Sequence, residues 1–302
     1  MSSAERHALI GIGLGCLVLA LKGLAWKLTG SVALYSDALE SIVNVAASAV
    51  AFIALRFAAR PADANHPYGH EKAEFFAAVI EGVMIVVAAL SIFRAAWHAW
   101  YHPEILSVPA TGLALSFVAT LINGIWAAVL LRAGKRLRSM ALEADGRHLI
   151  SDVVTSAGVA IGFGLTVLTS YQELDAIIAA VTGVYVLWSG TRMIGASVGG
   201  LMDMAPDTAE LRRIEAVIAE SGAGSIEAHD LRARQAGRQT FLDFHLVVPG
   251  GMTVSESHAI CDRIESALKT DMDHLAITIH VEPDEKAKRP RRGGRTRVIP
   301  AE

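Results

Sequence analysis

Cysteine is nearly absent from this chain of 302 residues, which has only Cys16 and Cys261. Two cysteines are too few for a small scaffold held together by disulfides. Cys16 lies in the first long apolar stretch and Cys261 in a much more polar region, so we do not expect them to pair. Isolated cysteines of this kind suit a reducing cytosol, where they act as small buried apolar residues.

Charged residues are also scarce: they make up 19% of the chain, whereas hydrophobic residues make up 53%. An average soluble domain has about 25% charged residues. Apolar stretches of about 20 residues recur in the first two thirds of the sequence, and each is long enough to cross a hydrocarbon core about 30 Å thick. A soluble enzyme is therefore not expected. The first stretch contains Lys22 and Lys27 and is too long for a cleavable signal, so we expect a permanent span.

The apolar segments predict a membrane α-helical bundle with six transmembrane helices over residues 9–203, preceded by a cytosolic N-terminus at 1–8. The segments run over about 9–28, 31–58, 75–97, 108–132, 146–170 and 175–197. Lys and Arg gather in the connection between the fourth and fifth segments, and the connection between the fifth and sixth has none. Because positive residues favour the cytosolic side, we expect both termini in the cytosol.

The sequence predicts a cytosolic α+β domain over residues 204–284, with the order α-β-β-α-β. The expected elements are a helix at 207–221, strands at 226–235 and 239–248, a helix from 253 to about 269, and a strand at 275–282. The second strand alternates, with Leu242, Phe244, Leu246 and Val248 on one face. Residues 285–302 are basic and are expected to be disordered, either solvated or in contact with anionic lipid.

Ionisable groups inside a bilayer are costly, so those in the second and fifth segments are candidates for function. Glu40 and Asn44, and likewise His148 and Asp152, have the i, i+4 spacing that puts both on one helix face. Two such helices can enclose a tetrahedral site for a divalent cation, whose charge the two carboxylates balance. A purely structural hydrogen-bond network is the alternative. Asp37 is a candidate accessory group, which either faces the cavity or pairs with a neighbouring helix.

A second cluster lies in the connection RPADANHPYGHEKAE, where Asp63, His66 and His70 gather around a proline and a glycine that bend the chain. Three such ligand types can converge on a metal, although a structural role for the histidines is the alternative. The chain is not a zinc protease of the H-E-x-x-H type, because Glu74 occupies the position of the second histidine.

The motifs SVALYSDALESIVN and PADANHPYGHEKAE, the HxxxD pair of His148 and Asp152, and the C-terminal histidines closely resemble those of the cation diffusion facilitator family of metal transporters. The resemblance covers about residues 9–283. It implies a homodimer with a metallochaperone-like cytosolic domain, which exports divalent metals from the cytoplasm in exchange for protons. It also implies a transport site and a loop site, formed respectively by Glu40, Asn44, His148 and Asp152, and by Asp63, His66 and His70.

By position, the resemblance further implies a cytosolic site for two metals at the dimer interface, formed by His229, His245, His258, His280 and Glu282. The strand alternation independently puts His245, His280 and Glu282 on the outer face of the sheet. The spacing of His258 from Cys261 would instead fit a core position for this histidine. An interlock between the membrane and cytosolic parts is implied at Lys72 and Asp203.

Zinc and iron transporters of this family have aspartates at the positions of Glu40 and Asn44, so the neutral Asn44 leaves the identity of the metal open. The sequence predicts a proton-coupled exporter in a bacterial inner membrane, with Zn²⁺ favoured over Fe²⁺, Co²⁺, Cd²⁺ and Mn²⁺. Sites made of nitrogen and oxygen bind zinc more tightly than manganese, iron or cobalt. The metal is expected both as substrate and as regulatory ligand, with no organic cofactor and no nucleic-acid partner.

The main alternative is a metal-sensing membrane scaffold that binds cations without transporting them. It predicts an intact cytosolic site and a disabled membrane site. A membrane metalloenzyme would need a general base beside an open metal position, and no such motif is visible. The composition does not distinguish uptake from export.

Overall fold

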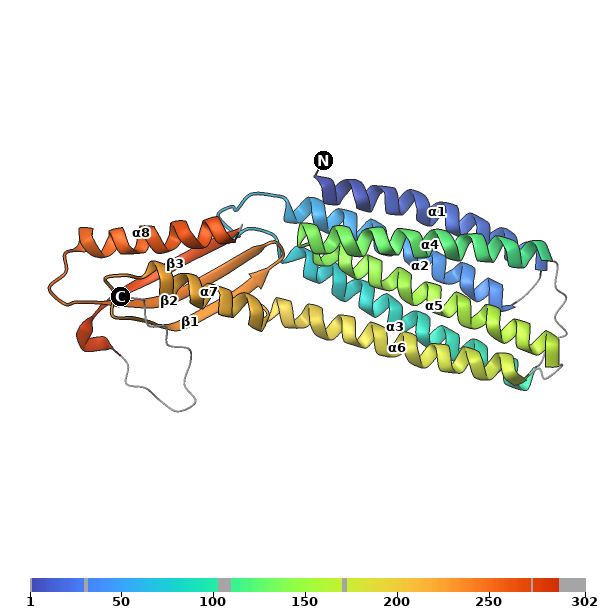
Figure 1. The fold of residues 1–302 in the computed structure, drawn as a ribbon. Coiled ribbons are helices and arrows are strands. Elements are labelled where there is room, and N and C mark those ends of the chain that lie inside the picture. Colours follow the sequence, from blue (N-terminus) through green and yellow to red (C-terminus); the bar gives the residue numbers. More distant parts are fainter. Residues whose placement is uncertain (1, 30–31, 103–109, 170–172, 273, 288–302) are drawn as a thin grey trace. The chain divides into compact units, whose positions relative to one another are not determined.

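The computed structural model describes residues 2–29, 32–102, 110–169, 173–272 and 274–287. The chain divides into two compact units, Met1–Leu201 and Met202–Glu302. The first is made of long helices, and the second combines a small sheet with two helices and a short 3₁₀ turn (Figure 1).

The predicted bundle of six helices is confirmed in the first unit. The helices are α1 (Ser3–Thr29), α2 (Val32–Ala58), α3 (Ala73–Tyr101), α4 (Ala110–Leu137), α5 (Met140–Thr169) and α6 (Glu173–Leu201). Within the described ranges, four stretches are long and apolar enough to cross a membrane: Ser3–Leu28, Glu40–Ala58, Ala73–Tyr101 and Ala114–Leu137.

The first helix begins earlier than expected. The apolar segment was predicted from about residue 9, whereas α1 begins at Ser3. Ser2 and Glu5 cap this helix reciprocally. The Ser2 hydroxyl accepts from the Glu5 backbone N–H at 3.1 Å, and the Glu5 carboxylate accepts from the Ser2 backbone N–H at 3.1 Å. This S-x-x-E capping box was the sequence signal for the earlier start.

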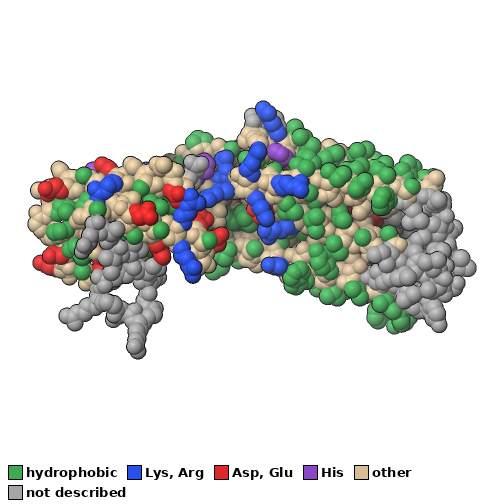
Figure 2. All heavy atoms as spheres, in the orientation of Figure 1, with side chains coloured by type: hydrophobic (Ala, Val, Ile, Leu, Met, Phe, Trp, Pro, Cys, Tyr) green, Lys and Arg blue, Asp and Glu red, His purple; other side chains and the backbone are tan. Residues whose placement is uncertain are grey.

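The helices of the first unit turn large apolar side chains outward and small or polar ones inward. Ile53, Trp97 and Phe117 are among the exposed apolar residues, and hydrophobic side chains are spread over the visible face of this unit (Figure 2). Alanines dominate the buried set, and α3 and α6 approach closely where Gly82 meets Gly190. This is the arrangement of a bundle whose surroundings are lipid, since small residues let membrane helices pack closely.

Helix α5 is the central helix of the bundle, because it contacts each of the other five. Helix α2 packs against α1, α3 and α5. Polar residues on α2 and α5 can therefore face one another inside the bundle, away from lipid.

The second unit has the predicted order α-β-β-α-β. Its elements are α7 (Thr208–Ser221), β1 (Glu227–Ala236), β2 (Gln239–Val248), α8 (Val254–Asp271) and β3 (Leu275–Pro283), followed by a 3₁₀ turn, η1 (Asp284–Lys286). The strands are in the order β1-β2-β3, with β1 and β2 antiparallel and β2 and β3 parallel. The predicted tail overlaps η1, so the expectation of disorder is wrong for residues 285 and 286, and residues 288–302 lie outside the described part.

The alternation in β2 is confirmed, because Leu242, Phe244 and Leu246 are buried in a core shared with α7 and α8. The core position considered for His258 is wrong: its side chain is 74% exposed. The buried stripe of α8 follows Ser257 and Cys261, and the next residue after Ser257 points about 100° away from that stripe.

Candidate metal sites

The structure brings three carboxyl groups together inside the helical unit. Asp37 and Glu40 on α2 and Asp152 on α5 each have one oxygen within 4.8 Å of the others. Asp37 and Asp152 are buried, and Glu40 is partly buried. We call these three residues the carboxylate cluster. It shares Glu40 and Asp152 with the predicted transport site and adds Asp37, which the sequence analysis gave only an accessory place.

The carboxylate cluster is held by side chains of α5 itself and of α1 and α4, two helices that the sequence did not connect to it. The Lys22 ammonium of α1 donates to Asp37 Oδ1 at 2.8 Å and to Asp152 Oδ2 at 3.0 Å. Asn123 of α4 donates from its side-chain amide to Asp152 Oδ2. The Thr155 hydroxyl donates to Glu40 Oε2 at 3.1 Å. The sequence signal for Lys22 was a charge inside an apolar span, which must find a counter-ion.

Asn44 and His148, the other two residues of the transport site, are buried without hydrogen-bond partners. Both side-chain polar atoms of Asn44 and both ring nitrogens of His148 lack a partner. Asn44 lies one turn after Glu40 on α2, and His148 lies one turn before Asp152 on α5. Buried polar groups are almost always paired. Free amide oxygen and imidazole nitrogen atoms beside carboxylates therefore fit a set of ligands for a cation.

A second group of buried polar residues includes Asp145, which lies one turn before His148 on α5. Asp145 accepts from the Ser48 hydroxyl of α2 at 3.1 Å. Glu81 of α3 is fully buried and lies close enough to Asp145 for their charges to interact. The sequence did not point to Glu81 or Asp145, because neither carboxyl belongs to a pair of candidate ligands with i, i+4 spacing.

The predicted loop residues also come together. Asp63, His66 and His70 each have one ligand atom within 4.8 Å of the others, with His66 Nδ1 at 3.2 Å from Asp63 Oδ1 and His70 Nε2 at 3.4 Å from Asp63 Oδ2. Gly69 turns the chain with a φ of +90°. The backbone N–H of His66, 2.7 Å from Asp63 Oδ1, lowers the pKa of that carboxyl below its ordinary value. The loop thus presents an ionised carboxylate and two imidazoles to one point.

The cytosolic unit forms a third group from His229, His245 and Glu282, with ligand atoms within 4.8 Å of one another. Glu282 lies 3.4 Å from His229 Nε2 and 3.2 Å from His245 Nδ1. The His280 ring stacks at a tilt on His245, with centroids 4.9 Å apart. Glu227, which the sequence analysis missed, is buried and lies 3.0 Å from His229 Nδ1. A carboxylate at that nitrogen orients the ring so that its other nitrogen is free to bind a metal.

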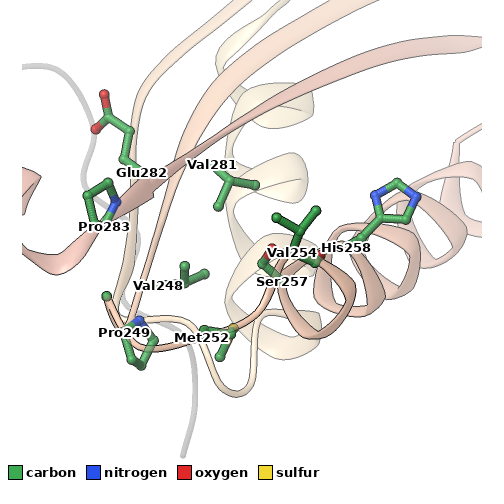
Figure 3. A pocket seen from close by; sticks show the side chains of 10 residues that line it. Val248, Pro249, Met252, Val254, Ser257, His258, Val281, Glu282 and Pro283 are labelled. Carbon is green, nitrogen blue, oxygen red and sulfur yellow. Dashed lines mark hydrogen bonds between the residues drawn. The ribbon is translucent and has the colours of Figure 1, made fainter.

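His258 does not belong to that group. It lines a pocket with Glu282, Val248 and Met252, and it projects from α8 on the other side of the pocket from Glu282 (Figure 3). The five predicted cytosolic ligands are thus divided within this chain into a compact group and one separate histidine.

The two residues predicted to interlock the units have partners within their own units. The Lys72 ammonium donates to the Leu201 carbonyl oxygen at 3.3 Å. Asp203 pairs with Arg234 at 3.0 Å. An interlock between Lys72 and Asp203 stays a prediction.

Residues 8–202 match the family described as the cation efflux transmembrane domain, and residues 206–284 match the cation efflux protein cytoplasmic domain. The chain belongs to the cation efflux family. This confirms the resemblance to cation diffusion facilitators, and the protein is a multi-pass membrane transporter of divalent metal cations rather than an enzyme.

The relatives of this cation efflux protein match along almost their whole length. An uncharacterised transporter of Synechocystis sp. is 43% identical over 285 residues, which cover 94% of this chain and 92% of that protein. The cation-efflux pump FieF of Serratia proteamaculans is 33% identical over 279 residues, with 92% of each chain covered. A solved structure of CzrB in its Zn form is 44% identical and covers 29% of this chain and 99% of that one, with a TM-score of 0.28.

Proposed function

We propose that this protein exports a divalent transition metal, with zinc favoured, from the cytoplasm across a bacterial inner membrane in exchange for protons. The carrying observation is the set of buried, unpartnered polar atoms of Asn44 and His148 beside the carboxylate cluster. Nitrogen and oxygen ligands of this kind suit zinc, iron, nickel and copper ions, and zinc binds more tightly than iron to such sites. The Zn form of CzrB is consistent with this choice.

The charges of the site favour exchange with protons. Three carboxylates and the Lys22 ammonium leave two negative charges, which one divalent cation neutralises. An empty site with two uncompensated charges would be costly in a bilayer. Because metal ligands must lose protons to bind, protons are the natural replacement when the metal leaves. Both termini are proposed to lie in the cytosol, and two chains to assemble as a homodimer.

Metal flux into inverted membrane vesicles tests this function. We expect Zn²⁺ uptake into vesicles containing the protein when the lumen is more acidic than the medium, and little uptake after the pH gradient is collapsed. Fe²⁺, Co²⁺, Cd²⁺ and Mn²⁺ are compared in the same vesicles. Metal binding without flux under either condition would favour the sensing scaffold and contradict the transporter.

Asn44→Asp is expected to retain transport but to change the preference among metals. Asn44 contributes a neutral oxygen. An aspartate in its place would change the net charge of the site from two negative charges to three. A stronger field favours every divalent ion, and the added carboxyl takes part in proton exchange, so the flux should depend more steeply on pH. Competition flux assays compare the unsubstituted chain, Asn44→Asp and Asn44→Ala. One shared order of preference and one pH profile would show that Asn44 is not a ligand.

The cytosolic site is proposed to regulate transport rather than to carry the metal. We expect His245→Ala with His280→Ala to reduce the number of Zn²⁺ ions bound per chain and to lower flux severalfold without abolishing it. A metal at this site stabilises the arrangement that binds it. Equilibrium dialysis and vesicle flux measure the two effects. His274→Asn is the control, since His274 is exposed with a φ of 66°, which asparagine tolerates. Unchanged zinc binding in the double variant would contradict the site.

A further inference from the structure

Lys22 is the largest fully buried side chain in the described part of the helical unit, and its ammonium lies among the residues proposed to bind the metal. It donates to Asp37 Oδ1 at 2.8 Å, to Asp152 at 3.0 and 3.3 Å, and to the Ser156 hydroxyl at 3.3 Å. None of its side-chain surface is exposed. A buried ammonium with two carboxylate partners is stable as a cation in this environment.

The two carboxylate partners of Lys22 differ in what else holds them. Asp37 Oδ1 also accepts from the Ser156 hydroxyl at 2.8 Å, so Lys22, Ser156 and Asp37 form a closed triangle of hydrogen bonds. Asp152 also accepts from the Asn123 side-chain amide. It lies one turn from His148, whose two ring nitrogens have no partner. Lys22 therefore has one partner, Asp37, with which it forms a closed set of hydrogen bonds, and a second partner, Asp152, which belongs to the proposed metal ligands.

An ammonium and a divalent cation compete for the same oxygens of Asp152. A lysine side chain is flexible and strongly charged, so a small rotation moves its ammonium without breaking its contact with a second acceptor. The energy of two unit charges a few ångströms apart is large away from water. An arriving metal must displace the ammonium from Asp152, and the energy needed for this lowers the affinity for the metal. The return of the ammonium to Asp152 favours the departure of the metal.

We propose that Lys22 is a tethered counter-ion of the transport site, which occupies Asp152 when no metal is bound and yields it to the metal while staying on Asp37. This inference rests on the proposed function and concerns the control of binding and release at that same site. Lys22 is a positioning residue, because it acts on the metal through Asp152. It keeps the affinity low enough for release and offsets the charge of Asp37.

A merely structural ion pair between α1 and α2 makes a different prediction from a counter-ion. If the pair only stabilises the bundle, removing either partner has effects of the same sign on metal binding. If Lys22 competes with the metal, removing Lys22 tightens binding, whereas removing Asp37 leaves the ammonium entirely to Asp152 and weakens binding. The double change removes both charges and returns the affinity toward its original value.

The test uses the full chain in detergent and in proteoliposomes, in a parent variant whose other candidate sites are disabled by Asp63→Ala, His70→Ala, His245→Ala and His280→Ala. Zn²⁺ is titrated at one fixed pH by calorimetry, and zinc flux is measured as a function of concentration. Lys22→Met is expected to bind Zn²⁺ at least about tenfold more tightly and Asp37→Asn at least about tenfold more weakly. Lys22→Met with Asp37→Asn is expected to bind within about threefold of the parent.

Zinc flux should also distinguish a counter-ion from a merely structural ion pair. For Lys22→Met, we expect both the half-saturating zinc concentration and the maximal flux to fall, because tighter binding slows release. Lys27→Met is the matched control, since Lys27 is an exposed lysine on the same helix, and it should change neither quantity.

Weaker zinc binding in both Lys22→Met and Asp37→Asn would overturn the inference that Lys22 is a counter-ion. If Lys22→Met does not yield folded protein, Asp37→Asn and the double variant decide: the double variant must bind more tightly than Asp37→Asn, and equal or weaker binding overturns the inference. If the parent binds and transports zinc and Lys22→Met changes neither the affinity nor the flux, the result contradicts the counter-ion role of Lys22 but not the proposed function. An unsubstituted chain that neither binds nor transports zinc contradicts the proposed function.

Discussion

Asp152→Asn is expected to reduce metal flux at least about 100-fold while leaving a folded protein. Loss of a residue that only supports a ligand typically costs about 10–100-fold in affinity or activity, so loss of a direct ligand should reach at least the upper end. Asparagine keeps the shape and one acceptor oxygen, which allows Lys22 and Asn123 to retain a partner. Asp152→Ala is expected to abolish flux too but to destabilise the bundle as well, because it breaks a buried ion pair.

Flux into inverted vesicles with an imposed pH gradient, together with thermal unfolding in detergent, checks this expectation. Glu220→Gln is the control for the loss of one acidic group, since Glu220 lies exposed on α7. Normal proton-driven flux in Asp152→Asn would contradict the assignment of Asp152 as a ligand. Lost flux in the control would show that the assay responds to charge in general.

His148→Ala is expected to lower zinc flux at least about 100-fold as well, with a smaller effect on stability than Asp152→Ala. His148 is buried with neither ring nitrogen hydrogen-bonded, so its removal breaks no hydrogen bond. The metal, in contrast, loses the only imidazole that the sequence places on this helix face. His148→Ala also removes a ligand that must be neutral to bind, so any residual flux should depend less on pH than that of the unsubstituted chain.

The control is His98→Ala, because His98 is an exposed histidine of α3 in the same unit. Flux at two zinc concentrations and two lumen pH values separates lost affinity from lost coupling. Equal flux in His148→Ala and His98→Ala would refute a role for His148 as a ligand, and it would leave its unpartnered nitrogens without a function.

The sequence by itself determined the elements and the local clusters. Apolar segments of membrane-spanning length predicted the six helices, and the alternation around Phe244 predicted β2 with its buried face. The loop group of Asp63, His66 and His70 was visible because its members lie within eight positions of one another, so a single bend brings them together. The matched i, i+4 pairs on α2 and α5 likewise identified a face on each helix.

Only the tertiary structure decided which faces meet and which charges compensate one another. Lys22 joins Asp37 and Asp152 across three helices, and Asn123 adds a fourth. Helical and strand periodicity tell which residues share a face of one element, but they carry no information on the partner of that face. For this reason the ligands on α2 and α5 followed from spacing, whereas the counter-ion on α1 became visible only in the packed bundle.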